Sequence, residues 1–101
     1  MEYFSLKDNV LTINYEPVND ICIFTKYCID LLANKNDDLY IKIDKDVNSL
    51  SSTYIGCMIS ASVTAQSINK KLHIICNESV KRWITMICGS HLSILTKEND
   101  E

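Results

Sequence analysis

The sequence has little glycine and proline, with two Gly and one Pro among 101 residues. This scarcity excludes a Gly/Ser linker and a Pro-rich segment, and the chain shows no internal repeat. Hydrophobic residues make up 47% of the composition, which is typical of a folded globule and not of a disordered chain. We therefore predict a single domain over residues 1–101, with a frayed acidic tail over about residues 97–101.

The sequence also lacks an excess of basic charge. Lys and Arg number 10 and Asp and Glu number 13, so the net charge is −3, and the two signs are interspersed. Nucleic-acid-binding proteins usually carry a basic patch that contacts phosphates. We therefore predict that the partner is not a nucleic acid.

Long hydrophobic runs are absent as well. No apolar run approaches the roughly 18 residues that a membrane span needs, and residues 1–20 lack the apolar segment of a signal peptide. The five cysteines are odd in number, form no Cys-x-x-Cys pair and sit among apolar residues: Cys22, Cys28, Cys57, Cys76 and Cys88. These features predict a cytoplasmic protein without a membrane span, whose cysteines are buried thiols.

The hydrophobic pattern predicts the order ββαβαβαβ. Two short strands with a turn at Lys7–Asn9 should occupy residues 1–15. The later elements are a helix that begins near residue 21, a strand over Leu39–Ile43, a helix from about Thr53 to Ile68, a strand over Leu72–Cys76, a helix between Asn77 and Gly89, and a short strand over Leu92–Leu95. Strand-helix-strand units of this length favour an α/β fold, here a single domain with a mainly parallel or mixed sheet of four or five strands and helices packed on it.

A cluster of hydroxyl side chains lies between one of these strands and the long second helix, in the stretch from Ser49 to Gly56. A Ser or Thr at a helix start can cap the first-turn N–H groups. The same place attracts negative charge, including phosphate. In parallel sheets, functional groups gather beyond the carboxyl ends of the strands, where this loop should lie. The cluster is therefore the candidate functional site, and an ordinary helix cap is the simpler interpretation.

Other residues with reactive side chains have simpler structural interpretations. His73 and His91 have no acidic or cysteine partner at metal-ligand spacing, so we expect structural or surface histidines. Cys57 lies near a helix start but on its apolar stripe, and no His partner is evident. Trp83 could anchor a partner, although its helical spacing favours packing. We predict no metal site, no cofactor and no enzymatic activity.

The element order and one local motif resemble those of STAS domains, the fold of bacterial anti-sigma-factor antagonists. The family signature is a strand, a short loop, and Asp-Ser-(Ser/Thr)-Gly-(Leu/Ile)-Gly opening the second helix; here the matching residues are Ser51-Ser52-Thr53-Tyr54-Ile55-Gly56. The second half, Lys70–Ile75, Val80–Trp83 and Cys88-Gly89, resembles the family's following strand, third helix and Gly stop. Ser51 stands where the family has its Asp, and Tyr54 where it has its first Gly.

The resemblance implies a function for the hydroxyl cluster. In the family, the Ser after the Asp is phosphorylated by a serine kinase that is also the anti-sigma factor, and phosphorylation breaks the complex. Carried over, the phosphorylated residue is Ser52, with Ser51 and Thr53 as alternatives. The implied partner-binding residues are Val47, Asn48, Ser49, Ser51, Ser52, Thr53 and Tyr54. The expected protein is a bacterial, cytoplasmic regulator of transcription, a monomer or weak dimer.

A second function stays open beside this one. STAS domains also act as scaffolds that are not phosphorylated and as small subunits of larger complexes such as lipid-transport assemblies. In that case the same face of the second helix would bind its partner without a switch.

Overall fold

The computed structural model describes residues 3–14, 21–47, 50–88 and 92–96. Its elements in chain order are β1 (Phe4–Lys7), β2 (Val10–Ile13), α1 (Ile21–Leu32), β3 (Asp38–Ile43), α2 (Ser52–Ser67), β4 (Lys71–Cys76), α3 (Glu78–Cys88) and β5 (Ser93–Thr96). This order confirms the predicted α/β class. The predicted acidic tail over residues 97–101 lies outside the described residues.

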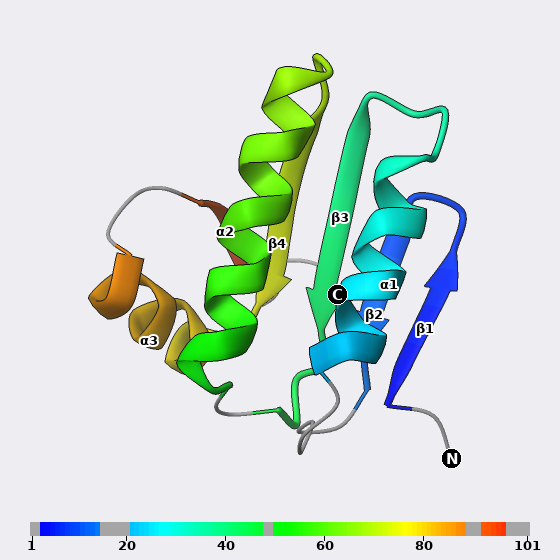
Figure 1. The fold of residues 1–101 in the computed structure, drawn as a ribbon. Coiled ribbons are helices and arrows are strands. Elements are labelled where there is room, and N and C mark those ends of the chain that lie inside the picture. Colours follow the sequence, from blue (N-terminus) through cyan, green and yellow to red (C-terminus); the bar gives the residue numbers. More distant parts are fainter. Residues whose placement is uncertain (1–2, 15–20, 48–49, 89–91, 97–101) are drawn as a thin grey trace.

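The five strands form one mixed sheet in the order β1-β2-β3-β4-β5. β1 and β2 pair as an antiparallel hairpin, whereas β2–β3, β3–β4 and β4–β5 are parallel pairs. Right-handed connections that all step the same way along a sheet place their helices on one face. Figure 1 shows α1 and α2 on one face of the sheet, with α3 at the side of α2. The same view places the start of α2 at the carboxyl ends of β3 and β4.

Side chains of the two central strands alternate between a buried face and a partly exposed face. In β3, Leu39, Ile41 and Ile43 are buried, while Tyr40 and Lys42 are half-buried. β4 repeats this alternation in register, since Ile41 pairs with Ile74. The nearly continuous apolar sequence of β4 therefore supplies one face to the core and leaves His73 and Ile75 on the other.

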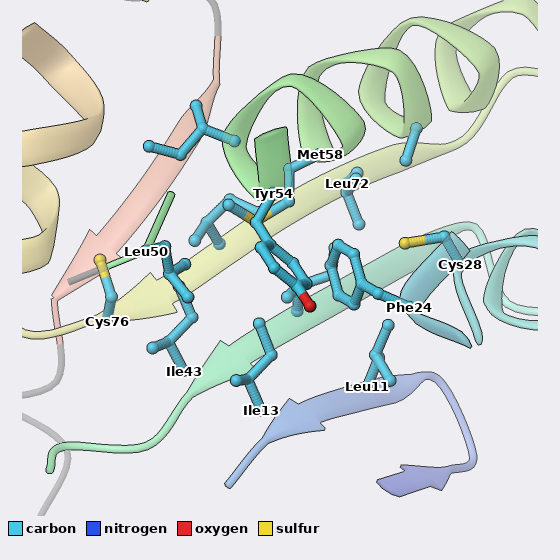
Figure 2. Close-up of a cluster of buried hydrophobic side chains, with 14 of the residues drawn as sticks. Leu11, Ile13, Phe24, Cys28, Ile43, Leu50, Tyr54, Met58, Leu72 and Cys76 are labelled. Carbon is cyan, nitrogen blue, oxygen red and sulfur yellow. The ribbon is translucent and has the colours of Figure 1, made fainter. Parts of the chain in front are cut away.

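The core lies between the sheet and the helices, as Figure 2 shows. An aromatic cluster forms its centre: the Phe24 ring lies 5.3 Å from that of Phe4 and 5.2 Å from that of Tyr54. α3 adds Val80 and Ile84, both fully buried, to the same core. One apolar core thus joins all three helices to the sheet.

The second helix ends in a Schellman motif. Lys70 N–H donates to the Ala65 carbonyl at 2.8 Å and Asn69 N–H to the Gln66 carbonyl at 3.1 Å, with Asn69 in the left-handed region at φ 63°. Asn tolerates this conformation better than most residues. The predicted apolar stripe of this helix is only partly confirmed, because Tyr54, Met58, Ala61 and Ala65 are buried whereas Ile68 is 45% exposed.

We expect Ile74→Ala to lower the free energy of unfolding by about 2–5 kcal/mol, because the substitution leaves a cavity between the sheet and its helices. Val63→Ala on α2 is the control. Val63 is 61% exposed, so this change should cost less than about 0.5 kcal/mol. Urea unfolding followed by circular dichroism measures both values, and equal losses would contradict the assignment of the core face.

Candidate functional site: the start of the second helix

The hydroxyl cluster is on the surface. Ser51, Ser52 and Thr53 are exposed, and they connect two buried segments: Leu50 before them is 4% exposed, and Tyr54 and Ile55 after them are buried. Because both flanks are anchored in the core, the three intervening residues must face outward. The structure therefore brings together the three candidate phosphorylation positions at the carboxyl end of β3.

The first turn of α2 is held by backbone groups and not by a capping side chain. The N-cap residue Ser51 is extended, with φ −68° and ψ 158°, and its side chain makes no capping hydrogen bond. Its carbonyl accepts from Tyr54 N–H at 3.1 Å and Ile55 N–H at 3.3 Å. The Ser51 hydroxyl is therefore not used as a cap, and Ser52 is the first helical residue, at the positive end of the helix dipole.

The loop that leads into α2 is fastened to α3 by side chains. Asn77 caps α3, since its Oδ1 accepts from Val80 N–H at 2.8 Å. Its Nδ2 donates to the carbonyls of Lys45, at 3.1 Å, and Val47, at 3.4 Å. The indole Nε1 of Trp83 donates to the Leu50 carbonyl at 2.6 Å. These bonds fix the position of the loop and place the Trp83 ring beside the hydroxyl cluster.

Two of the predicted partner-binding residues belong to the core. Val47 is 1% exposed and Tyr54 is 2% exposed. The prediction that they contact a partner is therefore wrong for their side chains. Both side chains pack in the hydrophobic core beneath the exposed residues. Tyr54, in particular, packs its ring on Phe24, which explains a large residue at that position. Asn48 and Ser49 lie outside the described residues.

An exposed apolar surface lies on α3, next to the tethered loop. Trp83 is 37% exposed, Met86 74% and Ile87 42%. Residues three and four apart share one helix face, so the three side chains form a continuous surface, which we call the α3 patch. The sequence pattern favours packing for Trp83. In the structure, Trp83 both donates a hydrogen bond to the Leu50 carbonyl and is 37% exposed.

Gly56 lies on the exposed side of α2 and has no side chain to protrude there. It lies one turn after Ser52, it is exposed, and a Cβ atom built on it would meet no other atom within 4 Å. No contact within the described structure therefore requires glycine here, although glycine lowers the stability of a helix interior.

His73 has partners that sequence reasoning missed. Its Nδ1 lies 2.9 Å from Ser93 Oγ, its Nε2 lies 3.5 Å from Asp38 Oδ1, and its ring stacks on Tyr40 at 5.2 Å. The order Asp–His–Ser matches that of a hydrolase triad with the two ring nitrogens exchanged. This group lies near the starts of β3, β4 and β5, the opposite end of the strands from the hydroxyl cluster. We interpret this group as structural, because the His73–Ser93 contact links β5 to β4 through side chains. Strand register brings these side chains together, since His73 pairs with Tyr40 of β3 and with Ser93 of β5, and no local sequence spacing predicts this.

The cysteines are less uniform than predicted. Cys28 and Cys76 are buried, Cys57 is half-buried and Cys22 is exposed, so the prediction of a buried thiol is wrong for Cys22. Burial and the neighbouring Cys57 raise the pKa of the Cys28 thiol well above its ordinary value. The Cys88 side chain, like Gly89 and His91, lies outside the described residues.

Within the described ranges there is neither a cluster of metal-binding side chains nor a helix that could span a membrane. No group of three or more His, Cys, Asp or Glu side chains there could hold a metal ion. None of the helices in that part of the chain has the length and apolar character needed to cross a bilayer.

Comparison with known proteins gives a likeness of fold. No protein-family model and no curated protein matches the sequence. A solved structure described as "NMR Structure of the protein TM1081" superposes with a TM-score of 0.67 over 95% of this chain and 81% of that chain, at 19% sequence identity. At this identity the match establishes the shared α/β architecture, and it says nothing of the site.

We expect Gly56→Ala to raise the free energy of unfolding by about 0.5–1 kcal/mol, because alanine loses less backbone entropy in a helix and its methyl group has room. Chemical denaturation of both proteins measures the gain. A loss of stability would show that the backbone at residue 56 makes a close contact that only glycine permits.

Proposed function

We propose that this protein is a regulatory protein-binding module that docks its partner on the start of α2 and the α3 patch, and that phosphorylation of Ser52 switches this docking. One observation carries the proposal. Three exposed hydroxyl residues open α2, and the hydroxyl at the N-cap is not used for capping. A helix start built only for stability would use that hydroxyl for the cap.

The location suits a phosphoryl group. A phosphoserine carries about −1.5 to −2 charges near neutral pH, and Ser52 lies at the positive end of α2. Modification there leaves the buried residues Leu50 and Tyr54 in place. The switch would therefore act on the surface, by adding charge and bulk where a partner docks, and not by unfolding the helix.

The neighbouring surface suits a protein partner. Interface cores are rich in aromatic residues and Met, and partly exposed Trp residues are frequent binding anchors. The α3 patch supplies Trp83, Met86 and Ile87 beside the loop that Trp83 holds. On α2, Gly56 offers an unobstructed helix surface one turn after Ser52, where a partner backbone can approach closely.

The resemblance to anti-sigma-factor antagonists supports a serine kinase, itself an anti-sigma factor, as the partner. The support comes from the Ser-Ser-Thr start of the second helix and from the order of elements. In this proposal the protein acts in the cytoplasm and is not an enzyme. Ser51 replaces the family's Asp, so the residue before the phosphorylated serine is neutral here.

A second candidate function is a scaffold or subunit that binds constitutively. The observation that favours it is the α3 patch, which exposes apolar side chains independently of any hydroxyl group. In this case the partner would be another subunit of a larger complex, and the charge at Ser52 would not matter.

Incubation of the purified protein with native extract and ATP should add one phosphoryl group, which peptide mapping assigns to Ser52. Ser52→Ala should abolish the modification, whereas the exposed Ser60→Ala on the same helix should keep it. Intact mass measures both. An unmodified protein, or a modification outside residues 49–53, would contradict the switch.

Partner capture distinguishes the two candidate functions. Under the first, immobilised Ser52→Asp should lose the protein that the unmodified chain retains from native extract. Thr64→Asp, at an exposed position about three turns further along α2, should retain it. Gly56→Gln adds bulk to the proposed surface without disturbing the core, and it should weaken capture under both candidates. If Ser52→Asp and Gly56→Gln both bind normally, the start of α2 is not the docking surface.

A further inference from the structure

Two cysteines from different helices meet between α1 and α2. Cys28 of α1 is 3% exposed and Cys57 of α2 is half-buried. Cys57 is one of the groups that raise the pKa of the Cys28 thiol, so the two thiols lie close enough to influence each other. Thr25, one turn before Cys28 on α1, places its Oγ1 3.6 Å from Cys57 Sγ. Residues 28 and 57 are 29 positions apart, so the fold and not the local sequence brings the two thiols together.

The two thiols differ in their burial and in their neighbours. Thr25 Oγ1 donates its single hydrogen to the Ile21 carbonyl at 2.8 Å. Its oxygen is therefore an acceptor toward the Cys57 thiol at 3.6 Å. Burial and the neighbouring sulfur hold Cys28 in its neutral form, because its pKa is raised. Cys57 is thus the more accessible thiol of the two.

We propose that Cys57 and Cys28 form a site of reversible thiol oxidation, in which a hydroperoxide converts the pair into a disulfide between α1 and α2. The proposal rests on the packing of these two helices and is independent of Ser52. Redox-sensing cysteines are commonly an accessible thiol with a second thiol nearby that resolves its oxidised form.

The reaction balances with the hydroperoxide as the sole oxidant. The Cys57 thiolate attacks one peroxide oxygen, the O–O bond breaks, and Cys57 sulfenic acid forms while the other oxygen leaves as water or an alcohol. The Cys28 sulfur then attacks the sulfenic sulfur; the S–S bond forms, the S–O bond breaks, and the Cys28 proton leaves with the departing oxygen as water. Two thiols lose two electrons in total, and the peroxide gains them.

The exposed Cys22 provides a matched control within the same helix as Cys28. It is more accessible than either member of the pair, so indiscriminate oxidation would modify Cys22 first. Preferential oxidation of Cys28 and Cys57 over Cys22 would therefore show that the surroundings of the pair, and not accessibility alone, determine its reactivity.

The test treats the reduced, folded protein with hydrogen peroxide, alkylates the remaining thiols after denaturation, and maps peptides without reduction. The unmodified chain and Cys22→Ser should each yield a Cys28–Cys57 linked peptide that dithiothreitol removes. Cys57→Ser should slow the oxidation of Cys28 by about tenfold or more, because the buried neutral thiol then lacks the accessible partner that reacts first. Oxidation of Cys22 with both Cys28 and Cys57 still alkylatable, or Cys57 sulfenic acid that never resolves, would overturn the proposal.

A second measurement requires no substitution and does not depend on any variant folding. Phenylarsine oxide binds two adjacent thiols together, so it should protect Cys28 and Cys57 of the folded protein from alkylation and leave Cys22 reactive. Failure to protect both members of the pair would show that the two sulfurs do not come within bridging distance, and would overturn the site.

Discussion

The burial of Leu50 on one side and of Tyr54 and Ile55 on the other is the constraint on which the candidate site depends. The three residues between these buried anchors, Ser51, Ser52 and Thr53, are all exposed. The Tyr54 ring packs against Phe24, and the Leu50 carbonyl accepts the Trp83 indole N–H at 2.6 Å, so both anchors are fixed by partners from other elements. The hydroxyl groups of Ser51–Thr53 are presented to solvent by the hydrophobic effect acting on their neighbours, and the site requires no strained backbone of its own.

The same core packs the three helices on one sheet and so determines which residues form the proposed docking surface. α2 supplies the hydroxyl residues, and α3 supplies Trp83, Met86 and Ile87. Asn77 joins the two by capping α3 while donating to the Lys45 and Val47 carbonyls. The proposed docking surface is therefore partly polar and partly apolar, and several elements hold it in place. The cysteine pair lies apart from it, where α1 meets α2, so oxidation and phosphorylation would act on different contacts.

Sequence reasoning predicted the fold well because the periodicities were strong. Alternation in Leu11–Ile13 and the helical spacing of Val80 and Ile84 depend on local geometry, and the structure confirms both. The exposure of individual site residues was predicted less well. Tyr54 lies at a position of α2 whose helical spacing from other apolar residues predicts burial. Its place in the family motif instead led to the prediction that it binds a partner. Val47 gave no such signal, since its burial depends on where the loop folds back on α3.

By itself, the sequence determined the class of fold, the order of its elements and the place of the hydroxyl cluster, because these follow from hydrophobic periods and from the residues at helix ends. Only the tertiary structure decided which side chains meet. The Asp38–His73–Ser93 chain, the Cys28–Cys57 pair and the bond from Trp83 to Leu50 each join residues at least 20 positions apart. Such contacts arise from strand register and helix packing, which no local pattern encodes. For that reason the sequence located the candidate site, and the structure decided which of its residues are exposed.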